Sequence, residues 1–142
     1  MNTDSPPNNQ VIVYWALWSA ILAGMISLQF LHGGGFPKGQ DAENPPQGFF
    51  LFCVAAVAIA TVVRWILIPK AKERGKLLVL MILGLALIDG AQIIQLFLIG
   101  NDFPQKQLIV FVLCIFGAAQ FAPFYASKIV SADSAQMASP RR

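Results

Sequence analysis

The sequence predicts an all-α fold, a four-helix transmembrane bundle that forms a single membrane domain over residues 1–142. Hydrophobic residues make up 56% of the chain and charged residues only 12%. A soluble domain carries about 25% charged residues, so this composition indicates a membrane protein. Four apolar runs are also long enough for a helix of about 20 residues to cross the hydrocarbon core. The lipid bilayer is therefore the first partner that the sequence predicts.

The four spans are expected at about residues 11–31, 48–68, 77–99 and 108–130. The first run ends at Gly33, the second at Pro69 and the third at Gly100, while Pro123 is expected to kink or end the regular part of the fourth. Inside hydrocarbon a backbone must pair its own polar groups, which favours helices, and no run alternates like a barrel strand. The tail 131–142 is expected to be disordered.

The connection between the second and third spans fixes the predicted orientation. It carries most of the basic residues near the spans, whereas the other two connections are close to neutral. The positive-inside rule places this basic turn in the cytoplasm, and both termini would then be cytoplasmic as well. The residues before the first span include no lysine or arginine, so we expect that span to be retained as a helix rather than cleaved as a signal peptide.

The remaining charged and sulfur-containing residues exclude several classes of site. The net charge of +3 comes from few residues beside the spans, which does not favour nucleic-acid binding. Cys53 and Cys114 each lie inside an apolar run, without a C-x-x-C motif or a Cys/His cluster. The sequence therefore predicts small buried thiols, with no metal site and no cofactor.

A carboxylate, Asp89, lies near the middle of the third span, about ten to twelve residues from each end. Inserting aspartate at that depth costs about 2.5–3.5 kcal/mol, so we expect Asp89 to face the bundle and to have polar partners. Gln92 and Gln95 follow at three-residue spacing and form one inclined polar stripe with it. Gly84 lies near the same side and would let another helix approach closely.

Three residues on neighbouring spans are candidate partners for Asp89. Gln120 and Thr61 are expected at a similar depth, and Arg64 about one helical turn nearer the cytoplasm. Two alternatives stay open for Arg64: it pairs with Asp89, or it extends toward the inner headgroups beside Trp65, which is the interpretation we favour. The polar group itself would either handle a proton or cation or provide an interhelical hydrogen bond that fixes packing.

Residues 48–99 resemble the proteolipid c-subunit hairpin of rotary ATP synthases. The resemblance rests on a small-residue-rich helix, on Arg64 and Pro69 beside a basic turn, and on the stretch L-A-L-I-D-G-A-Q-I-I. It implies an ion-carrying role for Asp89 with Gln92 as a ligand. The glycine repeat of that family is missing and two further spans flank the hairpin, so we do not expect a rotor subunit. The whole chain resembles uncharacterised small four-helix membrane proteins of bacteria, which implies the cytoplasmic (inner) membrane.

The chain contains none of the hydrolase, metalloprotease or phosphate-loop motifs that would indicate an enzyme. Four spans without an internal repeat also make a poor transporter on their own. We therefore expect a non-catalytic structural, accessory or self-associating subunit that forms a homo-oligomer or joins another membrane subunit. The alternative is an oligomeric protein that translocates protons or cations through Asp89.

Overall fold

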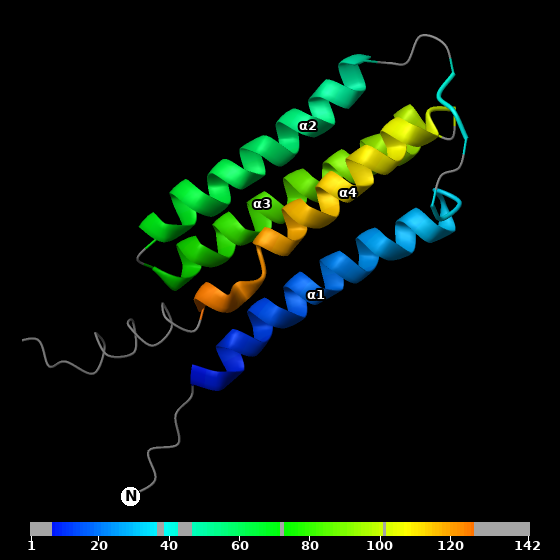
Figure 1. The fold of residues 1–142 in the computed structure, drawn as a ribbon. Helices are drawn as coiled ribbons and strands as arrows, with labels where there is room; N and C mark the ends of the chain where they lie inside the picture. Colours follow the sequence, from blue (N-terminus) through cyan, green and yellow to red (C-terminus); the bar gives the residue numbers. More distant parts are fainter. Residues whose placement is uncertain (1–6, 37–38, 43–46, 72, 101, 127–142) are drawn as a thin grey trace, which may run out of the picture.

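The computed structural model describes residues 7–36, 39–42, 47–71, 73–100 and 102–126. Over these residues the chain forms four long helices and no strand (Figure 1): α1 (Pro7–Leu31), α2 (Gln47–Val62), α3 (Arg74–Ile94) and α4 (Pro104–Gln120). With the turns that extend them, all four are long and apolar enough to cross a membrane. The predicted all-α fold of four membrane-spanning helices is confirmed. The tail expected to be disordered lies outside the described residues.

Three of the helices continue into tighter or wider turns. A π-helical turn, Val63–Leu67, extends α2, and another, Gln95–Ile99, extends α3. A short 3₁₀ turn, Pro123–Tyr125, follows a break at the end of α4. The break confirms the predicted effect of Pro123, because proline has no backbone N–H to continue the helical ladder. The fourth span begins at Pro104 rather than near residue 108, with the proline at a first-turn position that it favours.

Consecutive helices run in opposite directions along the bundle. The start of α1, the turn between α2 and α3 and the end of α4 share one end of the molecule, and the other two connections share the opposite end (Figure 1). Lys70 and Lys76 lie in or beside the α2–α3 turn, and we call this end the basic end. At the opposite end, Asp41 Oδ1 accepts a hydrogen bond of 2.8 Å from the Gln105 N–H at the start of α4.

The centre of the bundle lies where α2, α3 and α4 meet. A Cβ atom added to Gly117 of α4 would lie 3.2 Å from Ile88 Cδ1 of α3 and 3.3 Å from Val57 Cγ1 of α2. The Phe121 ring similarly packs on Gly84, where an added Cβ would lie only 2.1 Å from Phe121 Cζ. Gly84 therefore makes room for the Phe121 ring, and Gly117 makes room for side chains of α2 and α3.

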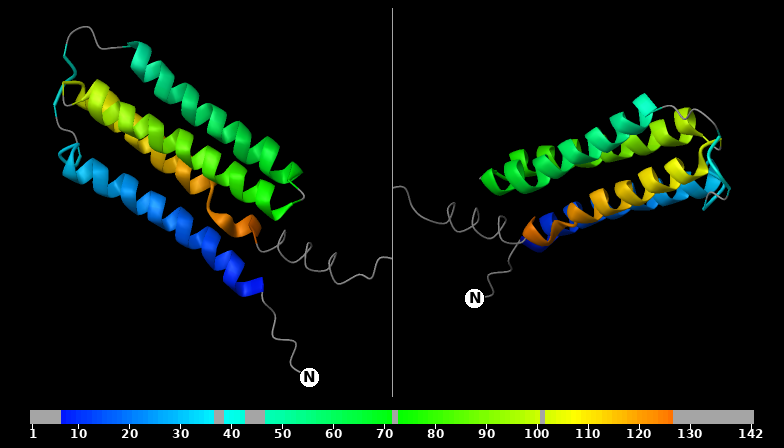
Figure 2. Two further views of the ribbon diagram at one scale, coloured as in Figure 1. Left: turned by 180° about the vertical axis from the view of Figure 1, so that it is seen from behind. Right: turned by 45° about the horizontal axis from the view of Figure 1, so that its top comes forward.

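The helix α1 packs against α3 and α4 along a narrower strip. Figure 2 shows it beside α4, on the far side of the bundle from α2. Among its described side chains only Tyr14, Met25 and Gln29 are buried. A Cβ atom added to Gly24 would meet nothing within 4 Å, because that face of α1 points away from the bundle. Most of α1 is thus left exposed by the single chain.

Candidate functional site

Asp89 lies on the flank of α3 near the middle of the span and is half-buried. It makes no hydrogen bond or ion pair with any other residue that the structure describes. It is therefore not brought together with Arg64, Thr61 or Gln120. The cause is geometric, because residues three apart on a helix differ by about 60° around its axis. Gln92 turns into the core, while Asp89 stays at its edge.

The two glutamines after Asp89 are fully buried, as the inclined polar stripe predicts. Gln92 Nε2 donates a hydrogen bond of 2.6 Å to the backbone carbonyl of Met25 in α1. Gln95 Nε2 donates one of 3.2 Å to Gln29 Oε1, also in α1. The stripe thus runs from the flank of α3 into the contact with α1. Its polar groups join these two helices.

Two further glutamines, Gln29 and Gln107, are also 0% exposed, and sequence reasoning missed both. Gln29 Nε2 donates a hydrogen bond of 2.9 Å to the Gly35 carbonyl, just beyond the end of α1. Gln107 lies in the first turn of α4, which the sequence analysis assigned to the connection before the fourth span. The proline three residues earlier was the available signal that the helix had already begun.

Arg64, Trp65 and Gln120 meet near the basic end, where α4 breaks. Arg64 Nε donates a hydrogen bond to the Gln120 backbone carbonyl, and Trp65 Nε1 donates one of 2.9 Å to Gln120 Oε1. The Arg64 guanidinium also lies over the Tyr125 ring at 4.3 Å and over the Trp65 ring at 5.1 Å. Gln120 lies nearer the basic end than expected, because α4 starts at Pro104 and the residue is therefore farther from the start of its helix than predicted.

This arrangement satisfies the Gln120 carbonyl, which the break in α4 leaves without its helical partner. The Phe124 N–H bonds to the Ala122 carbonyl instead of reaching back to Gln120, so the Gln120 carbonyl is free for Arg64. Trp18 Nε1 of α1 donates a hydrogen bond of 2.8 Å to the Ala118 carbonyl, two residues earlier, which also accepts one of 3.0 Å from the Phe121 N–H. Buried carbonyls need such partners. Side chains from α1 and α2 therefore hold the broken end of α4.

Thr61 contacts its own helix and takes no part in either polar group. Its Oγ1 donates a hydrogen bond of 2.9 Å to the Val57 carbonyl one turn earlier in α2. Threonine commonly bonds the i−4 carbonyl in this way within a helix. The residue is therefore a local feature of α2.

Comparison with protein families, curated proteins and solved structures finds no match for this chain. None of these comparisons supports the predicted resemblance of residues 48–99 to the proteolipid c subunit. Function has to be argued from the polar side chains placed by the four helices.

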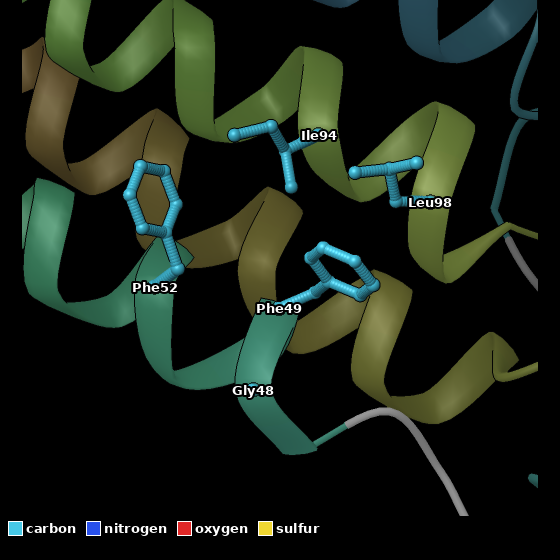
Figure 3. Close-up of a pocket in the computed structure, with 5 residues that line it drawn as sticks. All are labelled: Gly48, Phe49, Phe52, Ile94 and Leu98. Atoms are coloured by element: carbon cyan, nitrogen blue, oxygen red, sulfur yellow. The ribbon is translucent and has the colours of Figure 1, made fainter.

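An apolar groove of about 630 Å³ opens between α2 and the far end of α3. Figure 3 shows Phe49 and Phe52 of α2 facing Ile94 and Leu98 across it, with Gly48 at its edge. No charged or amide side chain lines it, so it has no group that could bind a polar ligand or perform acid–base chemistry. We place no reaction there.

The described residues contain no group of three His, Cys, Asp or Glu side chains close enough to share a metal ion. Both cysteines are free and buried, and Cys53 Sγ donates to the Ala91 carbonyl at 3.3 Å. The main polar groups within the described spans are Asp89, the buried glutamines and the Arg64 group.

Proposed function

We propose that this chain is a non-catalytic subunit of a membrane assembly and that it associates with copies of itself through the face of α3 that carries Asp89. Asp89 carries this proposal. It lies mid-span and half-buried, and no described residue of its own chain pairs with it. Carboxyl groups at such depth almost always face protein and find a polar partner. A neighbouring chain would supply that partner and cover the exposed side of the carboxyl group.

The exposed face of α1 supports the assembly proposal. Ala16, Ala20 and Gly24 recur every four residues on that face, and all three are exposed. Small residues at this spacing let a second helix approach closely in a bilayer. Gln92 contacts the opposite, buried side of α1 at Met25, so the small-residue face is a second exposed surface, separate from the one at Asp89.

The absence of catalytic motifs from the sequence supports a non-catalytic role. The proposed location is the cytoplasmic membrane of a bacterium, with the basic end on the cytoplasmic side. Its support is the lysine and arginine content of the α2–α3 turn, together with the nearly neutral connections at the opposite end. Accessibility of Lys76 to a membrane-impermeant amine reagent in intact cells, compared with inverted vesicles, tests that orientation.

Cysteine cross-linking in native membranes tests the assembly. Ile82 and Leu83 are neighbours on α3 and are similarly exposed, at 42% and 47%. Ile82 is seven residues from Asp89 and shares its face, whereas Leu83 points about 120° away. We expect Ile82→Cys to form disulfide-linked dimers and Leu83→Cys to remain monomeric on gels. Equal cross-linking at the two positions, or at neither, would contradict the proposed interface.

The second candidate is an oligomer that translocates protons or cations through Asp89. The observation that favours it is the row of polar side chains from Asp89 to Gln92 and Gln95, which leads from mid-span away from the basic end. Flux into proteoliposomes would be compared between wild type and Asp89→Asn. Equal flux with an unchanged number of copies would remove this candidate, whereas lost flux in an intact assembly would support it.

A further inference from the structure

Four glutamine side chains form a polar cluster inside the half of the bundle opposite the basic end. Gln29 of α1, Gln92 and Gln95 of α3 or its extension, and Gln107 of α4 are each 0% exposed. We call them the glutamine cluster. Amides buried among apolar side chains need hydrogen-bond partners for each donor and acceptor. The cluster can therefore be checked atom by atom.

Backbone carbonyls fix the orientation of two of the four amides, and one of these two fixes a third. Gln92 Nε2 donates to the Met25 carbonyl, and Gln29 Nε2 donates to the Gly35 carbonyl. A carbonyl only accepts, so neither amide can be reversed without placing two oxygens against each other. Gln29 Oε1 is then the acceptor for Gln95 Nε2. The oxygens of Gln92 and Gln95 are the atoms that remain, and both are buried without a partner in the described chain.

Gln107 adds a complete amide to these two oxygens. Its Nε2 and Oε1 are buried and have no partner in the part of the chain that the structure describes. The antiparallel contacts of Gly117 with Ile88 and of Phe121 with Gly84 advance by four residues on each helix. The same register carries Gln107 to the level of the extension of α3, about one turn beyond Gln95. Three acceptor oxygens and one donor group are thus buried without a partner in the described chain, spaced over about two turns along α3 where it meets α1 and α4.

The chemistry of these atoms selects the ligand. A monovalent cation would suit the oxygens, but it would bring a positive charge among neutral amides with no carboxylate in the cluster, and it would face the N–H groups of Gln107. Water donates to the oxygens and accepts from the Gln107 amide, so one species satisfies every atom. A buried water molecule makes roughly three hydrogen bonds, a number that this cluster can supply.

We propose that the glutamine cluster is a water-binding site that links α1 to α3 and α4 inside the bundle. Bound water molecules complete the hydrogen bonding of Gln92, Gln95 and Gln107 and extend the two direct contacts that α3 makes with α1. They also bring water to within one helical turn of Asp89. This inference concerns the interior of one chain and does not depend on the proposed assembly.

Solid-state NMR of the protein in lipid bilayers, with magnetisation transferred from water, tests the site directly. The glutamine side chains would carry ¹⁵N, and the methyl groups of Leu85 and Ile88 would carry ¹³C. These two residues serve as matched controls, because they lie on the same inward side of α3, are also 0% exposed and have apolar surroundings. We expect the side-chain amides of Gln92, Gln95 and Gln107 to receive magnetisation from water, whereas the methyl groups of both control residues should receive none.

Single Gln→Leu variants assign the amide signals, and the unchanged backbone spectrum of each variant confirms its fold. In Gln95→Leu, the transfer from water to the Gln107 amide should fall. Transfer from water to the amides that is as weak as transfer to the methyl controls would overturn the proposal, because the cluster would then contain no water. Amide shifts that change when sodium is replaced by choline would also overturn it, in favour of a cation site.

Discussion

Arg64 of the second membrane helix donates a hydrogen bond to the backbone carbonyl of Gln120, at the point where the fourth helix breaks. The same guanidinium lies over the rings of Trp65 and Tyr125, so its positive charge is stabilised by two aromatic rings as well as by the carbonyl oxygen. A cation held this way inside an apolar span is a packing element as well as a charge. The broken end of α4 depends on it.

Replacing Arg64 by leucine should therefore destabilise the bundle. The variant loses a charge-assisted hydrogen bond and leaves the Gln120 carbonyl unpaired, which together should lower the free energy of unfolding by about 2 kcal/mol. Arg64→Lys should fall between leucine and wild type, because an ammonium group lacks the planar stacking surface. Unfolding in detergent micelles measures both. Lys76→Leu, an exposed change at the same end, is the control and should stay within about 0.5 kcal/mol of wild type. An Arg64→Leu variant as stable as that control would contradict this role.

Gly84 and Gly90 provide a matched pair within α3. A Cβ at Gly84 would overlap the fully buried Phe121 ring, whereas one at Gly90 would meet nothing within 4 Å. We expect Gly84→Ala to lose about 1–3 kcal/mol of stability through overpacking. Gly90→Ala should be neutral or gain up to about 1 kcal/mol from helix propensity. Thermal unfolding of the two purified variants compares them, and equal effects would show that α3 and α4 do not pack as described.

Gln29 and Gln95 should be energetically coupled. A double-mutant cycle with leucine at both positions isolates their direct hydrogen bond, and polar pairs in membrane helices give coupling energies of about 0.6 kcal/mol, with a maximum of about 1.7 kcal/mol. The cycle of Gln29 with Gln120 is the control, because Gln120 lies near the basic end and bonds to Trp65. Its coupling should stay below about 0.5 kcal/mol. Additive effects at Gln29 and Gln95 would place α1 differently against α3.

Much of this architecture could be predicted from residue patterns. Long apolar runs marked the four spans, Pro123 marked the break, and the three-residue spacing of Gln92 and Gln95 put both on one inward stripe. Such features are local, so composition and helical periodicity are enough to find them. The helix starts were less accurate, because polar residues in the first turn of α4 resemble a connection.

The polar partners could not be predicted in the same way. Depth along a span does not specify the angle at which a side chain leaves its helix, and a shift of one residue rotates that side chain by about 100°. Asp89 was expected to face the bundle with Arg64, Thr61 or Gln120 as a partner, yet it lies half-buried on the flank of α3. Gln29 was overlooked because a lone amide in an apolar run has no spacing pattern, and only the packing of α1 on α3 brings it to Gln95.

Asp89 should control the number of copies in the membrane. Asp89→Leu removes a polar contact between chains that is worth about 1–2 kcal/mol, which corresponds to an affinity about 5- to 30-fold weaker for the dimer. Asp89→Asn keeps a side chain of the same size that donates and accepts hydrogen bonds, so its association should remain close to that of wild type. The asparagine variant therefore separates the polar contact from the negative charge.

The most direct measurement is single-molecule photobleaching of fluorescently labelled protein in lipid bilayers, over a range of protein-to-lipid ratios. We expect wild type and Asp89→Asn to bleach in two or more steps and Asp89→Leu to shift toward single steps at the same ratios. If wild type bleaches in single steps throughout, or if Asp89→Leu matches wild type, then Asp89 does not hold copies of this chain together.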